Sequence, residues 1–293
     1  MRASVIVPDL DSPWVGETLA ALAEQGVPGD GVEVLVVGRD APRQVPTDGG
    51  VRFLETAGRL NPAAARNRGV AAAAGRHLAF VDADCRPGPG WLQALEAALD
   101  TSPVAGGAVT FPRDGNRWAL ADNIASFHDL LPDRPAAATT AGPLGSLNLA
   151  CTRDAWHAVG PFDEALTTSE DLDWVWRARA AGLATAFTPA ALVRHAAARA
   201  DRAALVAHAR WYGAHFHAFR RRWPGAFATG PTWRRRGTLA ATAPAKAVAS
   251  ALGIFLRHRR QLAGCGRAWT GVVLFKWAWY RAVLASWPDG EGR

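Results

Sequence analysis

The sequence contains few cysteines, and none of them is spaced as in a metal site or a redox centre. Its three cysteines, in 293 residues, are Cys85, Cys151 and Cys265, which lie far apart and form no CxxC motif. An odd number of isolated cysteines argues against a disulfide framework, and it supplies no zinc-binding set. This cysteine usage fits a reducing compartment.

The beginning of the sequence also lacks the long apolar run of a secretion signal. Met1 and Arg2 lead directly into the segment 3–8 (ASVIVP). This apolar run is too short for a signal peptide, and it predicts a first β-strand. We therefore expect a cytoplasmic catalytic part.

Acidic residues are outnumbered, since 26 Asp and Glu stand against 33 Lys and Arg, for a formal charge of +7. The basic clusters lie in the last third of the sequence, at 220–222, 234–236 and 257–260. Such clusters attract nucleic acid, anionic lipid or phosphorylated substrates, because each of these is a polyanion. Charge alone leaves all three partners open.

Apolar residues make up 49% of the sequence, enough to bury a full core and an appendage. In the first third, strand patterns alternate with helix patterns, which predicts a doubly wound, mostly parallel α/β sheet with helices on both faces. The predicted strands are 5–7, 32–37, 51–54, 78–81, 104–111 and 145–151, and the predicted helices are 14–24, 62–74, 91–99, 118–131 and 153–159.

An apolar run, Leu78–Val81, ends abruptly in Asp82 and Asp84. Alternate residues of an extended strand point to the same side, so both carboxylates can project from its carboxyl end. Open α/β sheets bind ligands at these ends, and Mg²⁺ and Mn²⁺ prefer oxygen ligands. The alternative is an aspartate-rich turn leading into the segment 87–90 (PGPG).

Other polar residues follow the predicted strands or lie in the next helix. Asp40 could accept hydrogen bonds from a base or a ribose, and Arg66 could pair with a phosphate or fix an aspartate. Alternatively, Asp40 is a turn residue, and Arg66 and Arg68 form a solvated helix face.

A second acidic group follows Ser169, which is expected to cap a helix that ends at Gly182. Glu170 and Asp171 fall in its first turn, where acidic residues complement the helix dipole. The dipole does not explain why Asp173 joins them, and a general base is the natural use of one such carboxylate.

Six short motifs follow one another along the chain: Val5–Pro8, Val36–Asp40, Ala65–Gly69, Asp82–Asp84, Gly160–Glu164 and Glu170–Asp173. Each motif is weak by itself, but their order is specific. In this order they resemble a family 2 glycosyltransferase of the GT-A fold, and the resemblance covers residues 3 to 198. We therefore expect a GT-A catalytic domain at 1–200 and a helical C-terminal region at 201–293.

The resemblance implies a role for each matched residue. Asp82 and Asp84 correspond to the DxD motif, whose second aspartate coordinates the metal while the first faces ribose or metal. Asp171 corresponds to the catalytic base, and His195 is similar to a histidine that some members use as a further metal ligand, although a lone histidine is more often structural. The nucleotide-side residues are Pro8, Asp40, Arg66 and Ala83, and the acceptor-side residues are Glu170, Asp173 and Trp174.

Two positions depart from the family pattern. Gly38 replaces an aspartate that is usual at the end of the second strand, and the segment 9–11 (DLD) replaces a polar segment after Pro8. Contacts to the nucleotide base are therefore expected to differ from those of the family.

The resemblance implies an inverting hexosyltransferase that needs Mn²⁺ or Mg²⁺. A UDP-sugar is the expected donor, and the acceptor is a hydroxyl, for example on a lipid-linked or cell-envelope glycan. The metal would stabilise the departing diphosphate, and no residue is singled out as the nucleophile of a double displacement.

Two other functions stay open. A basic protein could bind nucleic acid through Trp and Arg side chains, although we expect no nucleic-acid partner. A catalytically inactive GT-A scaffold is the other alternative, and the presence of both Asp84 and Asp171 argues against it.

The last third of the sequence predicts a long helix at 201–223 and two apolar helices at 243–256 and 268–287. The last of these carries five Trp and Tyr residues together with Lys276 and Arg281, a composition typical of an interfacial helix. We expect peripheral contact with the inner face of the cell membrane, and the alternative is a packed helical appendage.

Overall fold

The structure, a computed structural model, describes residues 1–46, 49–226, 233 and 235–288. Arg234, in the middle of a predicted basic cluster, lies outside the described residues, as do 227–232 and 289–293 of the predicted helical region. The chain divides into two compact units. The first comprises Met1–Thr110 and Asp129–Ala196, and the second comprises Phe111–His128 and Ala197–Arg293. The segment 111–128 thus belongs with the C-terminal helices, unlike in the contiguous division expected from the sequence.

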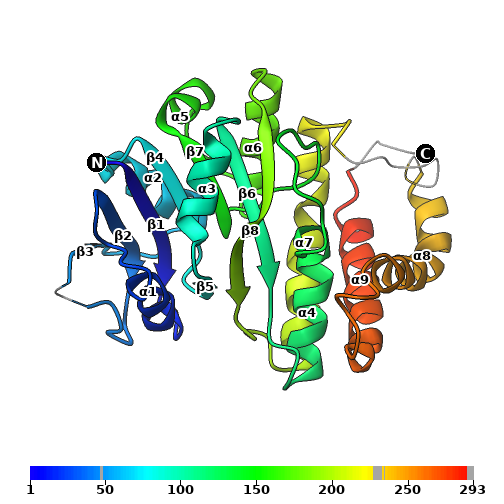
Figure 1. The fold of residues 1–293 in the computed structure, drawn as a ribbon. Helices are drawn as coiled ribbons and strands as arrows, with labels where there is room; N and C mark the ends of the chain where they lie inside the picture. Colours follow the sequence, from blue (N-terminus) through cyan, green and yellow to red (C-terminus); the bar gives the residue numbers. More distant parts are fainter. Residues whose placement is uncertain (47–48, 227–232, 234, 289–293) are drawn as a thin grey trace. The chain divides into compact units, whose positions relative to one another are not determined.

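The first unit is built on one sheet, which has eight strands in the described part of the chain (Figure 1). Their spatial order is β3-β2-β1-β4-β7-β6-β8-β5. The strands are β1 (Ala3–Leu10), β2 (Val32–Arg39), β3 (Val51–Glu55), β4 (His77–Val81), β5 (Cys85–Pro87), β6 (Val104–Thr110), β7 (Asn148–Thr152) and β8 (Thr185–His195).

The direction of the strands changes across this sheet. The strands β1 to β4 are mutually parallel, as the alternation of strands and helices predicted. The strand β7 runs antiparallel to both β4 and β6, and β5 runs antiparallel to β8, while β6 and β8 are parallel. The sheet is therefore mixed, with a parallel half that begins the fold.

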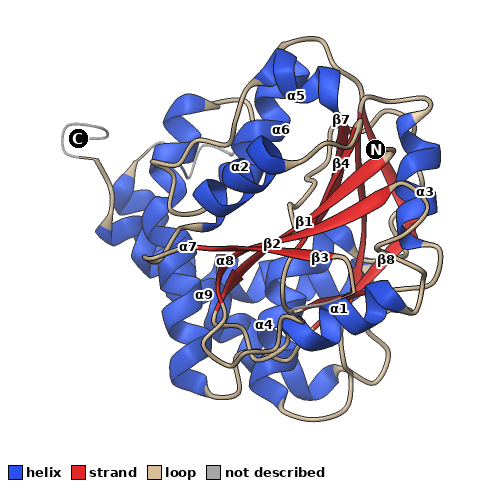
Figure 2. Ribbon diagram, turned by 90° about the vertical axis from the view of Figure 1, so that its left-hand side faces the viewer, coloured by secondary structure: helices blue, strands red, loops and turns tan. Residues whose placement is uncertain are grey.

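Helices cover both faces of the sheet, which confirms the predicted fold class. Figure 2 shows α2, α5 and α6 on one face and α1 and α3 on the other. Asn61 caps α2 by accepting a hydrogen bond from the Ala64 amide, and Pro62 occupies the first helical position. The helices are α1 (Val15–Ala23), α2 (Pro62–Ala72), α3 (Trp91–Leu99), α5 (Arg153–Val159) and α6 (Glu170–Ala180).

A cluster of aromatic side chains packs α5 and α6 against the sheet. The rings of Trp156 and Trp174 stack with centroids 5.7 Å apart, and Phe162 lies edge-on to Phe80 of β4 at 5.4 Å. Buried aromatic side chains of this size contribute about 2 to 3 kcal/mol each through removal from water. This packing fixes the start of α6, where the predicted acidic motif lies.

The second unit is helical. Its α9 packs against α4, α7 and α8. Lys276 of α9 donates a hydrogen bond to the Ala125 carbonyl of α4, and a Cβ added at Gly271 would lie 2.5 Å from the Ala121 Cβ. The helices are α4 (Arg117–Phe127), α7 (Arg202–Arg222), α8 (Arg236–Arg257) and α9 (Trp269–Ala285), with the short 3₁₀ helix η3 (Gly266–Ala268). A further 3₁₀ helix, η1 (His128–Leu130), lies where the chain passes from the second unit to the first.

These contacts favour the packed helical appendage that the sequence left open for the last helix, and contact of this helix with a membrane stays a prediction. The residues Val272, Phe275, Ala278 and Val283 of α9 are buried inside the second unit. Composition suggested a helix at a membrane surface because it cannot distinguish aromatic residues that pack against neighbouring helices from those that meet lipid. The helix α9 is a core helix of its unit.

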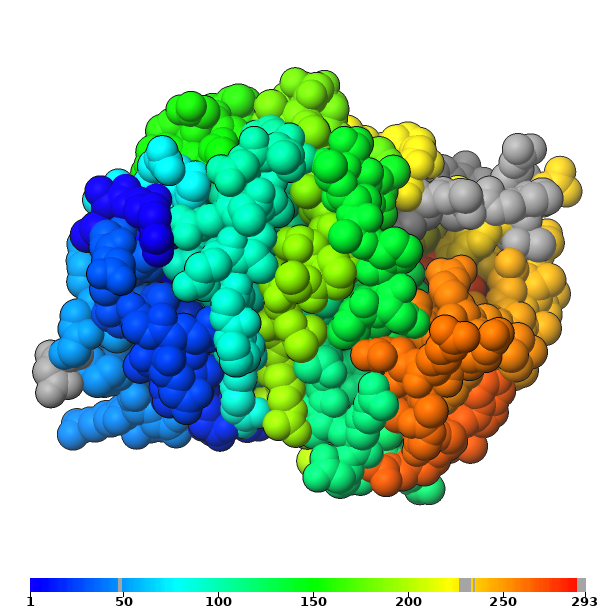
Figure 3. All heavy atoms as spheres, in the orientation of Figure 1, coloured from blue at the N-terminus to red at the C-terminus, as the bar shows by residue number. Residues whose placement is uncertain are grey.

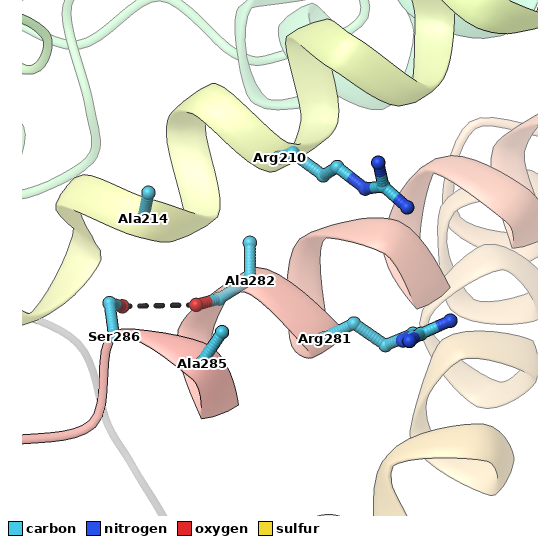
Figure 4. A pocket seen from close by; sticks show the side chains of 6 residues that line it. All are labelled: Arg210, Ala214, Arg281, Ala282, Ala285 and Ser286. Atoms are coloured by element: carbon cyan, nitrogen blue, oxygen red, sulfur yellow. Dashed lines mark hydrogen bonds between the residues drawn. The ribbon is translucent and has the colours of Figure 1, made fainter.

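A cavity of about 450 Å³ lies between α7 and α9 (Figure 4). Residues with small side chains form most of its wall. Its lining residues are Arg210, Ala214, Arg281, Ala282, Ala285 and Ser286. None of these is a residue that the sequence predicts for catalysis or donor binding.

Candidate active site

The DxD motif lies in a tight turn directly after β4. The Cys85 amide donates a hydrogen bond to the Asp82 carbonyl, at 3.0 Å, and this bond closes the turn. The strand itself ends at Val81, so the expectation that Asp82 and Asp84 project from an extended strand is wrong. The turn is the local structure that the aspartates and the following proline-glycine segment also favoured.

The carbonyl group of Ala83 fixes this turn to the start of the chain. It accepts a hydrogen bond from the buried Thr18 hydroxyl, at 2.9 Å, and a longer one from the Ser12 hydroxyl, at 3.3 Å. The backbone between the two aspartates is therefore held from outside the turn as well as from within it. Ala83 participates in the geometry of the site through its main chain.

His195 lies beside Asp84 because β5 pairs with the end of β8, with Cys85 opposite His195. The Nε2 atom of His195 is 3.4 Å from Oδ2 of Asp84, and its Nδ1 is 2.8 Å from the Ala196 carbonyl oxygen. A carbonyl can only accept, so Nδ1 carries a hydrogen, and Nε2 is the ring atom that faces Asp84. A protonated ring forms an ion pair with Asp84, and a neutral ring can share a cation with it.

This arrangement bears on the expected metal ion. Within the described ranges, no group of three or more His, Cys, Asp and Glu side chains is placed to hold a metal. Asp84 and His195 supply two ligands, and Mg²⁺ and Mn²⁺ sites are commonly completed by water and by the phosphate oxygens of a substrate. The two residues fit an ion that arrives with a diphosphate.

Arg66 connects the two acidic motifs. From α2, its guanidinium donates one hydrogen bond to Asp82, at 2.6 Å, and another to Glu170 at the start of α6, at 2.8 Å. Burial lowers the pKa of Arg66, but the charges of Asp82, Glu170 and Asp171 more than offset this and raise it. Of the two roles considered for Arg66, pairing with an aspartate is the one that these contacts support.

Glu170 faces this guanidinium and is itself buried. Burial, followed by the neighbouring charge of Asp171, raises the pKa of Glu170 to about 7, against the opposing effect of Arg66. One carboxylate oxygen of Glu170 is taken up by Arg66, and contact of Glu170 with an acceptor stays a prediction. The group is poised to change protonation state near neutral pH.

Asp171 is half-buried and held by Ser146, which precedes β7. One carboxylate oxygen accepts hydrogen bonds from the Ser146 amide at 2.9 Å and the Ser146 hydroxyl at 3.2 Å. The other accepts from the Leu172 amide, at 2.7 Å. Ser169 occupies the predicted cap position, but it has a φ of 64° and its side chain makes no cap hydrogen bond. Ser146 itself has no sequence signal, because it precedes Asp171 by many residues and belongs to no motif.

Asp173 and Trp174 are buried and bond to other residues of the first unit. The Asp173 side chain is 0% exposed and accepts a hydrogen bond from Arg177 one turn later in α6. The Trp174 indole nitrogen donates to the Gly160 carbonyl at 2.8 Å. Both residues therefore help to hold α6 in place, and their contact with an acceptor stays a prediction.

The predicted nucleotide-side residues Pro8, in β1, and Asp40, directly after β2, both make contacts within the protein. The two carboxylate oxygens of Asp40 accept hydrogen bonds from the Gln44 and Val45 amides, at 3.0 and 2.7 Å, so Asp40 closes its own loop. Pro8 is half-buried in β1, where it pairs in register with Val37 of β2. Contact of Asp40 and Pro8 with a nucleotide stays a prediction.

The departure at Gly38 has a backbone cause. Gly38 has a φ of 140°, and a Cβ added there would lie 1.8 Å from the carbonyl oxygen of Asp9, its register partner in β1. No side chain fits at position 38 without moving the strands. Burial, with the charges of Asp40 and Asp11, raises the pKa of Asp9 to about 6.

Comparison with known proteins identifies the family. The family model described as "Glycosyltransferase like family 2" matches residues 2–214. The pre-mycofactocin glycosyltransferase of Mycobacterium tuberculosis is 35% identical over 141 residues, which are 46% of this chain and 30% of the relative. Glycosyltransferase AglE of Haloferax volcanii is 29% identical over 199 residues, which are 63% of each chain. The chain thus spans about a third to two thirds of the length of these curated relatives.

Solved structures share the fold at low sequence identity. A mannosyltransferase, PcManGT from Pyrobaculum calidifontis, has a TM-score of 0.59 at 19% identity, over 99% of this chain and 88% of that chain. TarS from S. aureus has a TM-score of 0.52 at 16% identity, over 72% of this chain and 40% of that chain. Both likenesses confirm the GT-A type of fold. The match of the family model over most of the chain establishes that this protein belongs to the glycosyltransferase like family 2.

Proposed function

We propose that the protein is an inverting, metal-dependent glycosyltransferase that transfers a sugar from a nucleotide-sugar donor to a hydroxyl acceptor. The observation that carries the proposal is the pair of hydrogen bonds from Arg66 to Asp82 and Glu170. One buried guanidinium joins the metal motif to the motif of the base. Such a link has a clear use if both motifs act on one substrate.

In this proposal, Asp84 and His195 hold a Mn²⁺ or Mg²⁺ ion that stabilises the charge of the diphosphate leaving group. The short distance between Nε2 of His195 and Oδ2 of Asp84, 3.4 Å, lets both atoms contact one cation. The structural neighbour PcManGT is described as a complex with GDP-Man and Mn²⁺. Asp82 is held back from the ion by Arg66 and is left to face the ribose or the metal through its second oxygen.

The proposed base is Asp171. Its two oxygens accept hydrogen bonds from Ser146 and Leu172, and these bonds orient the carboxylate without neutralising it. Asp171 removes the proton of the acceptor hydroxyl as that oxygen attacks the anomeric carbon from the side opposite the diphosphate. One displacement of this kind inverts the anomeric configuration.

For the donor we propose a UDP-sugar. The S. aureus TarS neighbour is described in complex with UDP, while PcManGT is described with GDP-Man, so both nucleotides occur on this fold. The acceptor is proposed to be a hydroxyl of a lipid-linked or cell-envelope glycan.

The test is a panel of UDP- and GDP-sugars, read by thermal stabilisation and by hydrolysis, with and without Mn²⁺. We expect one donor to stabilise the protein in the presence of Mn²⁺, and Asp84→Ala to abolish this stabilisation. Asp171→Asn should keep donor binding and lose turnover.

Two outcomes would contradict the proposal. The first is unchanged turnover in Asp171→Asn, which would remove this residue from the role of base. The second is the absence of stabilisation by any sugar nucleotide together with salt-sensitive oligonucleotide binding, which is the behaviour of the basic nucleic-acid-binding alternative.

A further inference from the structure

The helix α8 is apolar on both of its faces. Its inner face carries the buried residues Leu239, Ala243, Ala247, Ala251 and Ile254. The opposite face is open to solvent, although it carries three large apolar side chains. Val248 and Leu252 are each 48% exposed, and Leu256 is 60% exposed. Figure 3 shows α8 in gold to orange at the surface of the second unit.

The exposed face forms a continuous strip along the helix. At 100° per residue, positions 241, 245, 248, 252 and 256 fall on one side, and all five are exposed. We call Ala241, Ala245, Val248, Leu252 and Leu256 the apolar strip. A surface helix of a water-soluble domain ordinarily has polar residues on this side, and a helix that is apolar all round is typical of burial or of contact with lipid.

The charged residues of α8 lie at its two ends and at one position on its flank. Lys246, on the flank, is the one charged residue between positions 237 and 256. The helix ends at Arg257, and Arg259 and Arg260 follow, all three exposed. The apolar strip therefore runs into a basic end, and this combination complements a bilayer that carries anionic headgroups.

The packing of the inner face limits the orientation in which α8 can contact a bilayer. Among the described helices, α8 is the one that is long and apolar enough to cross a membrane, with a mean hydropathy of 1.6. However, Leu239, Ala243 and Ala247 form one buried cluster with Tyr280 and Val283 of α9. A spanning orientation would have to break this cluster. A helix that lies in the plane of the interface keeps it and buries the apolar strip in lipid.

We propose that the second unit docks onto an anionic lipid bilayer through the apolar strip of α8, with Arg259 and Arg260 at the lipid phosphates. This contact uses no residue of the donor or metal site, so it stands apart from the proposed transferase activity. It assigns membrane contact to α8 in place of the tryptophan-rich α9. A second copy of the chain is the other occupant that could cover the strip.

The experiment is co-sedimentation of the full chain with phosphatidylcholine vesicles that contain or lack phosphatidylglycerol. We expect binding to the phosphatidylglycerol vesicles that weakens as salt is added. The double variant Leu252→Gln/Leu256→Gln should lower the partition coefficient at least ten-fold. The control Ala240→Gln adds the same side chain at an exposed position of α8 outside the strip, and it should bind as the wild type does.

A second pair of substitutions separates the charge from the apolar contact. Arg259→Gln and Arg260→Gln should each weaken binding to phosphatidylglycerol vesicles by about five-fold, and the effect should vanish in high salt. Circular dichroism checks that each variant stays folded. The Asp84→Ala variant should bind vesicles as the wild type does, whatever its transferase activity, so failure of one proposal is distinguishable from failure of the other.

Three results would overturn the proposal. The first is a wild-type chain that stays in the supernatant with anionic vesicles. The second is a leucine double variant that still binds as tightly as the Ala240→Gln control. The third is self-association that is detected by light scattering without lipid and is lost in the double variant, because the strip would then be covered by a second copy.

Discussion

The two units of this protein differ in which side chains they bury and which they leave exposed. In the first unit, charged groups such as Arg66, Glu170 and Asp173 are buried and paired on the helices α2 and α6. In the second unit, Val248, Leu252 and Leu256 are left open to solvent on α8. Burying charge and exposing apolar surface both cost stability, so each arrangement indicates a purpose other than stability. Under the two proposals, that purpose is chemistry on a charged substrate in the first unit and contact with a lipid surface in the second.

The largest effect is expected for the proposed base. Asp171→Asn keeps the hydrogen bonds to Ser146 in similar geometry but cannot take a proton, so kcat should fall by about 10³-fold. Donor KM should change little, because the contacts to the nucleotide are elsewhere. Steady-state kinetics measure both quantities. A kcat within ten-fold of the wild type would weaken the view that the buried charges serve chemistry.

A smaller but still large effect is expected at the link between the motifs. Arg66→Met leaves the carboxylates of Asp82 and Glu170 without their partner, and removing one member of a buried pair costs about 3 kcal/mol of unfolding free energy. Urea denaturation measures this loss. Arg66→Lys is the matched variant, since it keeps the charge but cannot bridge both carboxylates. A variant Arg66→Met as stable as the wild type would show that the link is dispensable for folding.

The pH dependence of stability tests the burial of Glu170, which faces Arg66 and Asp171. The pKa of Glu170 is about 7 in the folded state against 4.5 for the free side chain, so the folded state binds the proton more tightly. Its contribution is therefore full below about pH 4.5 and is lost as the pH rises through 7, a change on the order of 3 kcal/mol. The difference in unfolding free energy between wild type and Glu170→Gln, followed against pH, should show this fall. A flat difference would contradict the raised pKa.

A moderate effect is expected when Asp171 loses one of its hydrogen bonds. Ser146→Ala removes the hydroxyl at 3.2 Å and leaves the amide at 2.9 Å, so kcat should fall by about ten-fold with little change in donor KM. Ser286→Ala is the control. It removes a hydroxyl of the second unit that bonds to the Ala282 carbonyl, and it should leave kcat unchanged.

The smallest effect is expected for the exposed face of α8, in the second unit. Leu252→Gln replaces an exposed side chain, so the unfolding free energy in lipid-free buffer should change by less than about 0.5 kcal/mol. Ala247→Gln, on the inner face of the same helix, should cost several-fold more because it forces a polar group into a packed cluster. Equal losses in thermal denaturation would show that the strip is covered in solution.

Much of the first unit was predictable because its pattern is local. The alternation of apolar strands with amphipathic helices predicted β1 to β4 and their parallel order, and Asn61 with Pro62 marked the start of α2. These features follow from short segments whose periodicity or spacing carries the information. The nearness of His195 to Asp84 was implied only by the family resemblance, and it arises because β5 pairs with β8.

The remaining features depend on contacts between distant segments. The hydrogen bonds of Ser146 to Asp171 and of Arg66 to Glu170 join elements that only the completed sheet brings together. The inward position of Trp174 depends on how α6 rotates about its axis, which its acidic first turn does not determine. The burial of α9 and the exposed apolar face of α8 have the same origin, because composition does not say which apolar helix its neighbours cover.

The hydroxyl of Thr18 has a consequence for how a donor would be bound. Together with the Cys85 amide, it immobilises the peptide between Asp82 and Asp84 before any ligand arrives. In the proposed enzyme, a donor would then meet a turn whose backbone requires no ordering on binding. Less of the free energy of donor binding would be spent on arranging the chain, and more would be left to hold the sugar nucleotide.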